Sequence, residues 1–174
     1  MLFVWLLPLI FIIHDTEEII TMQSWLAANR PRLRPYEERF RFIRYALKFN
    51  NVTKAQFTGA VFIELFVLAG ASALFFSSAQ SEAAKFIYLS FNTALFIHLF
   101  MHVGQSVILK SYTPGVITSL LVLIPGGILI YKFLLQWDFV NMTQILISIP
   151  TGTVLIFPIL FGSLFISKKL IRGN

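Results

Sequence analysis

The sequence has no cysteine and little charge, and both shortages limit what the protein can be. Without cysteine it forms no disulfides, thiolate metal sites or cysteine nucleophiles. Charged residues make up 13% of its 174 residues, against about 25% in a typical water-soluble domain, which argues against a soluble protein. A hydrophobic content of 57% and nineteen phenylalanines exclude a disordered chain. The composition indicates an integral membrane protein, in which a net charge of +6 reports on topology and not on nucleic-acid binding.

Five stretches are apolar over the roughly 20 residues that a helix needs to cross the hydrocarbon core of a bilayer. We expect residues 1–174 to form one transmembrane domain, an all-α polytopic bundle of about five membrane-spanning helices. No basic residue precedes Leu2 and no small-residue cleavage site follows, so we expect the first stretch to stay as a helix. Pro125 and Pro158 predict kinks in the last two spans. The expected spans are about 2–28, 57–77, 85–109, 114–134 and 143–166.

Lysine and arginine gather on one side of this arrangement. With alternating spans, twelve of the fourteen basic residues lie on the side of the link between the first two spans, and only Lys85 and Lys132 lie on the other. Cytoplasmic loops of membrane proteins carry the excess of basic residues. The distribution therefore predicts an N-terminus outside and a C-terminus in the cytoplasm.

The basic link between the first two spans contains a helical pattern of its own. Pro31 and Pro35 predict the end of the first helix. Over residues 36–50 apolar and basic residues alternate at helical spacing, which predicts an amphipathic helix in the inner interface, in contact with anionic lipids. A role in binding a lipid substrate or a nucleotide is the alternative. The apolar positions are Tyr36, Phe40, Ile43 and Leu47, and the basic ones are Arg39, Arg41, Arg44 and Lys48.

Polar residues inside the predicted spans give the clearest indication of function. Each acidic side chain at the centre of a membrane helix costs about 2.5–3.5 kcal/mol. Several such residues must therefore be protonated, paired with one another or bound to a cation. The set comprises four acidic residues and all three histidines: His14, Asp15, Glu17, Glu18, Glu64, His98 and His102.

Spacing and depth predict that most of this set forms one site. At about 100° per residue, His14, Glu17 and Glu18 project from one face of the first helix. His98 and His102 are four residues apart and also share a face. At about 1.5 Å per residue, both groups lie in one layer roughly 10–15 Å below the inner surface.

Imidazole and carboxylate are the usual donors for Zn²⁺ or Fe²⁺ where thiolates are absent, so we predict one or two divalent ions. Glu64 lies at the same depth and is either a ligand or base, or a protonated carboxyl paired with its neighbours. Asp15 points away from the shared face and is expected to be structural. Histidines that only make interhelical hydrogen bonds are the alternative. The expected metal ligands are His14, Glu17, Glu18, His98 and His102.

Three motifs carry a resemblance to a known family. His-Asp-Thr-Glu-Glu begins at His14, a further histidine stands at His102, and Tyr-Thr-Pro-Gly begins at Tyr112. The chain resembles the HXXEE family of small bacterial membrane proteins, whose pattern combines H-x-x-E-E, a further histidine and Y-x-P-G. The resemblance implies a protein of the bacterial cytoplasmic membrane with a membrane-embedded, metal-dependent hydrolase activity, and it leaves the role of His98 open. Tyr112 is expected either to anchor the chain at the interface or to reach a substrate head group.

The leading hypothesis is a metal-dependent hydrolase that acts on a lipid or another apolar substrate from the cytoplasmic leaflet. A metal ion with an open position lowers the pKa of water toward about 7, and Glu18 or Glu64 would accept and return the proton. Two ions would permit oxidation chemistry instead. The alternatives are a proton- or divalent-cation-coupled transporter and a metal-free acid–base lipid isomerase, and the oligomeric state stays open.

Overall fold

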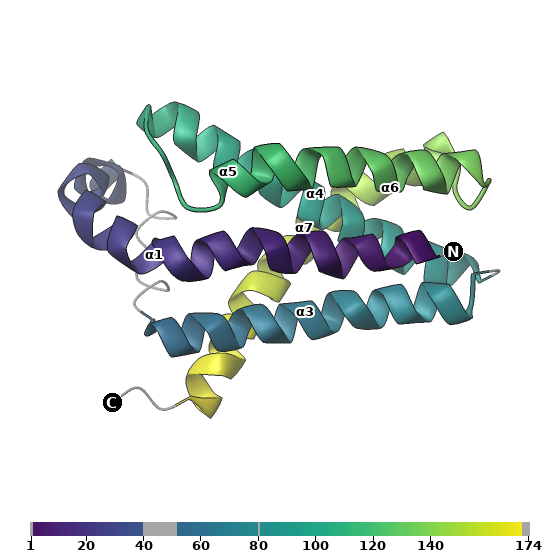
Figure 1. Cartoon of the computed structure of the whole chain (residues 1–174), viewed down its shortest axis with the longest axis horizontal. Helices are drawn as coiled ribbons and strands as arrows, with labels where there is room; N and C mark the ends of the chain where they lie inside the picture. The colour runs from purple at the N-terminus through teal and green to yellow at the C-terminus, as the bar shows by residue number, and fades with distance from the viewer. Residues whose placement is uncertain (1, 40–51, 80, 172–174) are drawn as a thin grey trace.

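The computed structural model describes residues 2–39, 52–79 and 81–171, and every regular element in these ranges is a helix. The predicted all-α class is confirmed. The helices form a bundle (Figure 1). In chain order they are η1 (Leu2–Trp5), α1 (Leu6–Arg39), α3 (Lys54–Ser77), α4 (Glu82–Leu109), α5 (Val116–Thr118), η2 (Ser119–Leu123), α6 (Ile124–Gln136) and α7 (Met142–Leu170).

Within the described ranges, four helical runs are long and apolar enough to cross a membrane: α3, α4, the run from α5 to α6, and α7. The first helix is outside this set, because acidic residues interrupt its apolar half. It nevertheless lies beside α3 in the bundle (Figure 1), and its outward residues Leu9 and Ile20 are apolar, with 52% and 65% of their surface exposed. Its polar His14 is fully buried. Apolar residues outside and polar ones inside suit a helix surrounded by lipid, and a fifth crossing stays a prediction.

The first helix is longer than predicted, since α1 continues through Pro31 and Pro35 to Arg39. The prediction that these prolines end the helix is wrong. A proline removes one N–H and leaves the carbonyl four residues earlier without its helical partner. Those carbonyls belong to Ala27 and to Pro31 itself, both exposed, so water can hydrate them. The end of α1 bends away from the line of the rest of the helix in Figure 1.

The amphipathic helix predicted for residues 36–50 falls mostly outside the described part of the chain. Residues 36–39 form the last part of α1, and residues 40–50 lie outside the described residues. Contact between this segment and anionic lipids stays a prediction.

The run from Val116 to Gln136 contains one widened turn. In η2 the bonding is π-helical, and the backbone N–H of Ile124 donates to the carbonyl of Ser119. Pro125 follows at once and has no N–H to continue the regular pattern. The wide turn thus absorbs the break that proline causes, and the chain stays helical to the end of α6. Such turns are rare and are frequent at functional sites.

The last helix, α7, crosses the others obliquely (Figure 1) and packs on α3 and α4. At the α4 crossing, a Cβ added to Gly152 would lie 2.8 Å from the backbone nitrogen of Ala94. At the α3 crossing, a Cβ on Gly59 would collide with the side chain of Ser167. Small residues let membrane helices approach closely, so these two glycines set the position of α7.

Buried hydrogen bonds fix α4 among its neighbours. The Thr93 hydroxyl lies 2.6 Å from the Tyr131 hydroxyl of α6 and 2.7 Å from the Ser148 hydroxyl of α7. Five residues earlier on α4, the Tyr88 hydroxyl donates to the carbonyl of Val4 over 3.2 Å. Interhelical bonds of this kind are worth about 0.6 kcal/mol each in membranes. Together they tie α4 to η1, α6 and α7.

Candidate metal site

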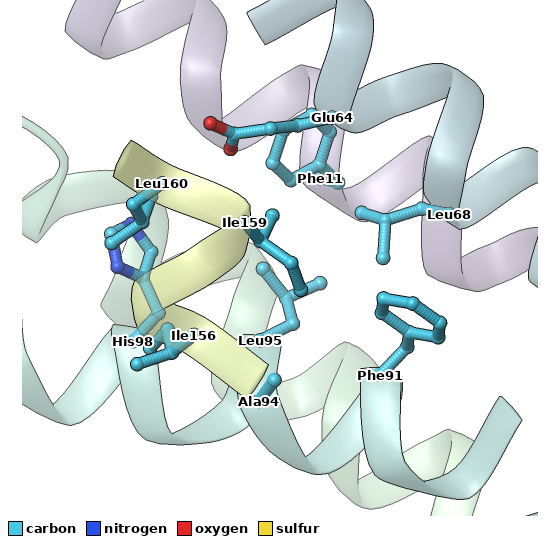
Figure 2. A pocket seen from close by; sticks show the side chains of 10 residues that line it. All are labelled: Phe11, Glu64, Leu68, Phe91, Ala94, Leu95, His98, Ile156, Ile159 and Leu160. Carbon is cyan, nitrogen blue, oxygen red and sulfur yellow. The ribbon is translucent and has the colours of Figure 1, made fainter. Parts of the chain in front are cut away.

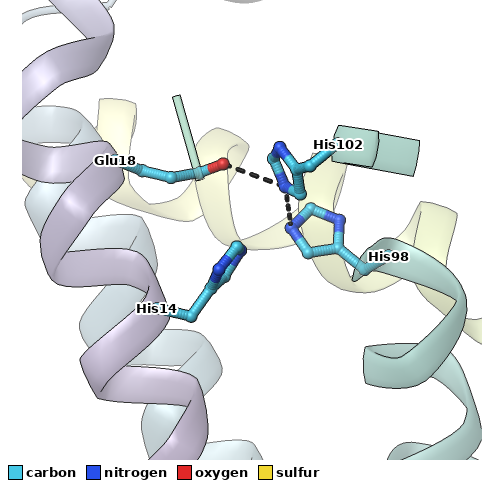
Figure 3. Close-up of side chains that lie close together, drawn as sticks. All are labelled: His14, Glu18, His98 and His102. Carbon is cyan, nitrogen blue, oxygen red and sulfur yellow. Dashed lines mark hydrogen bonds and ion pairs between the residues drawn. The ribbon is translucent and has the colours of Figure 1, made fainter. Parts of the chain in front are cut away.

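Two helices contribute four side chains that converge on one point inside the bundle. His14 and Glu18 lie one turn apart on α1, and His98 and His102 lie one turn apart on α4, so each pair shares a helix face. One donor atom from each residue lies within 4.8 Å of all the others. Figure 3 shows the two pairs pointing toward each other. We refer to these four residues as the His/Glu cluster.

The distances inside the His/Glu cluster are those of closely packed donor atoms. Nε2 of His102 lies 2.9 Å from Nε2 of His98 and 3.0 Å from Oε1 of Glu18. In a tetrahedral site with bonds of about 2.0–2.2 Å, neighbouring ligand atoms stand about 3.3–3.6 Å apart. Small side-chain rotations would therefore bring the cluster to the geometry of a bound ion.

The His/Glu cluster is buried, and a buried polar atom without a hydrogen-bond partner or a bound cation destabilises the fold. His14, Glu18 and His102 are 0%, 5% and 5% exposed. Among the described residues, Nε2 of His14 and Oε1 of Glu18 make no hydrogen bond. Oε1 of Glu18 lies 3.0 Å from Nε2 of His102, but the angle between the two groups is not that of a hydrogen bond. Leaving a buried polar atom unpaired costs about 1–3 kcal/mol. The donor set thus fits a divalent cation of the zinc or iron type.

His14 is held in one orientation by a threonine. The Thr118 hydroxyl donates to Oε2 of Glu17 over 2.6 Å, and it lies 3.0 Å from Nδ1 of His14. Because the hydroxyl hydrogen is used on Glu17, the threonine oxygen accepts the Nδ1–H of His14. This assigns the proton to Nδ1 and leaves the lone pair of Nε2 facing the cluster. A metal-ligating histidine is typically oriented by such a bond at its other ring nitrogen.

Glu17 lies next to the His/Glu cluster and is not one of its four members. Its Oε2 also accepts the backbone N–H of Thr118 over 2.8 Å, in the first turn of the helical run that begins at Val116. Its Oε1 accepts the hydroxyl of Tyr112 over 2.8 Å. Both oxygens of the Glu17 carboxylate are therefore engaged by Thr118 and Tyr112, and the carboxylate is not one of the groups that converge on the cluster.

Tyr112 lies at the edge of the site, in the link between α4 and α5, and 37% of its surface is exposed. Its hydroxyl lies 3.2 Å from Oγ1 of Thr21 in addition to its bond to Glu17. Partial burial raises the pKa of the Tyr112 phenol above its ordinary value, and Glu17 raises it further. The phenol is therefore a hydrogen-bond donor at neutral pH.

The Tyr-Thr-Pro-Gly motif packs directly on the His/Glu cluster. Gly115 has a left-handed backbone with φ of +83°, and a Cβ there would lie 2.9 Å from Oε1 of Glu18. The same atom would lie 2.9–3.0 Å from the His14 and His102 rings. Only glycine combines this conformation with this approach. The Thr113 hydroxyl donates to the carbonyl of His102 over 3.3 Å. The two motifs of the sequence are thus parts of one site.

The other two polar residues of the spans lie outside the His/Glu cluster. Glu64 of α3 is 7% exposed and accepts the hydroxyl of Ser163 from α7. Its carboxyl group and the His98 ring both line one pocket (Figure 2). Asp15 is 3% exposed, and among the described residues its Oδ2 has no hydrogen-bond partner. The sequence predicts Glu64 at the depth of the cluster, and the structure puts it on the lining of a pocket that His98 also lines.

Several residues of the site carried no signal in the sequence. Thr118 stands in an apolar stretch, and its link to His14 depends on how α5 begins after the Gly115 turn. Trp25 donates its indole N–H to the carbonyl of Tyr112 over 2.7 Å. Ser163 pairs with Glu64 across 99 residues of sequence. Each of these contacts is set by tertiary packing, which a spacing argument on single helices does not reach.

Together the fold and the site define a helical membrane protein with a buried histidine–glutamate cluster between its first helix and α4. The profile of the family described as "Protein of unknown function with HXXEE motif" matches residues 5–130. The chain therefore belongs to the HXXEE family, and the resemblance carried by its motifs is confirmed. The matched stretch contains all four members of the His/Glu cluster.

A relative is known by sequence. The chain is 29% identical over 154 residues to the "Uncharacterized protein YrkK" of Bacillus subtilis (strain 168), covering 86% of this chain and 87% of the relative. No solved structure matches the chain.

Proposed function

We propose that the protein is a membrane-embedded metal-dependent enzyme, a hydrolase that acts on a lipid or another apolar molecule. One observation carries the proposal: four buried donor atoms from α1 and α4 converge, and two of them make no hydrogen bond among the described residues. A purely structural polar cluster pairs its donors with acceptors. Nε2 of His14 and Oε1 of Glu18 have no such partner among the described residues, and a cation would satisfy both.

The four members of the His/Glu cluster have unequal roles in this proposal. Catalytic zinc sites use three protein ligands and keep one position open. His14, Glu18 and His102 are the most buried donors and would hold the ion. His98 is less buried and also lines the pocket, so a position for water would be left on its side. An ion held there supplies a Lewis acid that activates water.

The remaining residues bind, orient and move protons. Thr118 and Glu17 hold His14 with its Nε2 toward the ion. Glu64, on the pocket beside His98, would accept a proton from water and return it to the leaving fragment. Tyr112 stands at the exposed edge of the site, where it would donate a hydrogen bond to a substrate head group or hold Glu17 in place.

Elemental analysis of the purified protein tests the proposal before any substrate is known. We expect roughly one zinc or iron ion per chain after gentle purification without chelator. The variants His14→Ala and Glu18→Gln should lose the ion. The matched control is Glu82→Gln, which removes an exposed carboxylate at the other end of α4. Wild-type protein without bound metal overturns the proposal.

A second candidate function is supported by a specific feature, the hydrogen-bonded series from exposed Tyr112 through Glu17 and Thr118 to buried His14. Such a series could pass protons to the cluster, as in a proton- or cation-coupled transporter. Flux of protons or Zn²⁺ into proteoliposomes, abolished by Glu17→Gln, would favour the transporter. Absence of flux from protein that holds its metal would leave the hydrolase.

We also propose that the protein lies in a bacterial cytoplasmic membrane with its N-terminus outside. The C-terminal ends of α1, α4 and α7 and the N-terminal end of α3 lie toward one end of the bundle, on the left of Figure 1, and carry most of the described basic residues. Because the chain has no cysteine, single cysteines can report each side. A cysteine at the exposed position of Lys110 should react only from the cytoplasm, and one at the exposed position of Asp138 only from outside.

A further inference from the structure

One face of α1 holds the link between α4 and α5, which dips toward α1 in Figure 1. Glu17, Thr21 and Trp25 stand four residues apart and therefore form one stripe along α1. Tyr112, in the link, contacts the whole stripe. Its hydroxyl group lies 2.8 Å from Oε1 of Glu17 and 3.2 Å from Oγ1 of Thr21. Its carbonyl accepts the indole N–H of Trp25 over 2.7 Å. We refer to these four residues as the Tyr112 group.

The polar hydrogens of the Tyr112 group are already used within the protein. The Thr21 hydroxyl donates to the carbonyl of Glu17 over 2.7 Å, and the Tyr112 hydroxyl donates to Oε1 of Glu17. The indole N–H of Trp25 is bonded to the link. The oxygens of Thr21, Tyr112 and the Glu17 carboxylate still have free lone pairs. The group can therefore accept further hydrogen bonds, but it has no hydrogen left to donate.

The Glu17 carboxylate also gives the group a negative charge without a basic partner. Its two oxygens accept three hydrogen bonds, from the Tyr112 hydroxyl and from the hydroxyl and backbone N–H of Thr118, and such bonds stabilise the anion. Among the described residues, Glu17 forms no ion pair. Acceptor oxygens around an unbalanced negative charge favour a cation that brings N–H donors of its own.

The surroundings of the group indicate that this cation comes from the membrane. Glu17 and Thr21 are half-buried, and Tyr112 is 37% exposed, so a ligand can reach their oxygens. Beside them on α1, Ile13 and Ile20 present apolar side chains that are 41% and 65% exposed. Tyrosine and tryptophan side chains are enriched where a membrane meets water. A negative acceptor group bordered by exposed hydrocarbon fits a molecule with a cationic head and a hydrocarbon chain.

We propose that Glu17, Thr21 and Tyr112 bind the primary ammonium head group of an amine-bearing lipid. A primary ammonium carries three N–H donors, which suit the acceptor oxygens of the three residues. The proposal deepens the proposed function, because Oε2 of Glu17 is linked through Thr118 to His14 and the bound head group would lie beside the His/Glu cluster. It rests on the proposed function only for the view that this lipid is a substrate, since head-group binding can be measured by itself.

A long-chain primary amine with a diazirine on the carbon chain near its nitrogen provides the probe. The full chain is reconstituted in nanodiscs of phosphatidylcholine, whose quaternary ammonium has no N–H, and is photolysed with the probe. Mass spectrometry then locates the labelled residues, which we expect within 13–25 or 112–118. Phosphatidylethanolamine, which has a primary ammonium, should compete with the probe, whereas phosphatidylglycerol, which has none, should not.

Two variants test the residues that bind the head group. Glu17→Gln removes the charge and should reduce labelling about tenfold, which corresponds to about 1.4 kcal/mol of binding. Thr21→Val removes one acceptor oxygen, keeps the shape of the side chain and should reduce labelling a few-fold. The matched control is Thr16→Val. The Thr16 hydroxyl also donates to a carbonyl of its own helix over 2.7 Å, that of Ile12, but it makes no hydrogen bond to Tyr112, so labelling should stay unchanged.

Two results would overturn the proposal. One is labelling that neither Glu17→Gln nor Thr21→Val reduces, and the other is equal competition by phosphatidylglycerol and phosphatidylethanolamine. Equal competition by butylamine, a water-soluble primary amine, would assign the site to a soluble ligand and overturn the lipid.

Metal content measured on the same samples separates this proposal from the proposed function. Thr21→Val should lose the probe and keep metal, since Thr21 is not a member of the His/Glu cluster. His14→Ala should lose metal and keep the probe. Wild-type protein that binds the amine but holds no metal supports the ammonium site and overturns the enzyme. Protein with metal but without amine-specific labelling gives the reverse result.

Discussion

The hydroxyl group of Thr118 is the smallest part of the site whose removal tests the metal hypothesis. It accepts the Nδ1–H of His14 and donates to Glu17. The variant Thr118→Val keeps the shape of the side chain and deletes both bonds. Glu17 still accepts the backbone N–H of residue 118 over 2.8 Å, so the start of the helix at Val116 is retained. The perturbation is therefore directed at the tautomer and orientation of His14.

The expected magnitude follows from the role of this bond. Loss of the hydrogen bond that orients a metal-ligating histidine typically lowers metal affinity 10- to 100-fold, which equals about 1.4–2.8 kcal/mol. We expect a loss in this range for Thr118→Val, measured by competition for Zn²⁺ against a chromophoric chelator in detergent. Thr118→Ser keeps the hydroxyl group and should bind within a few-fold of wild type.

A matched control separates metal binding from general destabilisation. Thr93→Val also removes a buried threonine hydroxyl with two hydrogen bonds, and Thr93 stands about 140° around α4 from His98, on another face of the helix. It should lower the unfolding temperature without changing metal affinity. If Thr118→Val binds Zn²⁺ as tightly as wild type, Thr118 does not orient His14 and the tautomer assigned above is refuted.

Three further predictions concern glycine positions and the interface. Gly115→Ala forces a side chain into a left-handed backbone and against the His/Glu cluster, which should destabilise the protein by about 1–3 kcal/mol and lower its metal content. The control Gly70→Ala, which has open space at its Cβ, should change neither quantity. Thermal unfolding in detergent measures the difference in stability. Gly152→Val meets the backbone of α4 and should lower the unfolding temperature by more than Gly70→Ala does. Tyr112 should ionise above its ordinary pKa of 10.0 in a difference absorbance titration against Tyr112→Phe. Since its pKa is raised in the folded state, its contribution to stability is present below pH 10.0 and is lost as the pH rises through the folded value.

The sequence was sufficient to predict the centre of the site. His14 and Glu18 were expected on one helix face, and His98 and His102 on another at matched depth, and the structure brings these four together. This convergence, without Glu17, was predictable because polar residues in a membrane span are expensive and face inward, and because helical periodicity fixes which of them share a face; their role as metal ligands stays a prediction. The depth argument also placed Glu64 near the site, on the pocket that His98 lines.

Other parts depended on packing that a single sequence does not contain. The helix did not end at Pro31 and Pro35, because their freed carbonyls are at exposed positions. The Tyr-Thr-Pro-Gly motif was expected to serve the interface, whereas its glycine also packs against the cluster. Thr118 reaches His14 only because the backbone turns at Gly115 with a positive φ, and local patterns gave no sign of that contact.

The wide turn of η2 separates the part of this helical run that contacts His14 from the part that packs closely against other helices. A regular helix advances about 100° per residue, so the faces of all its residues are fixed once one residue is placed. The extra residue in the π turn resets this angular phase between the two halves. Before it, Thr118 meets His14. After it, Gly126 and Gly127 approach Ile10 and Phe96. The chemistry at one end and the close helix packing at the other can therefore be aligned independently within a single membrane crossing.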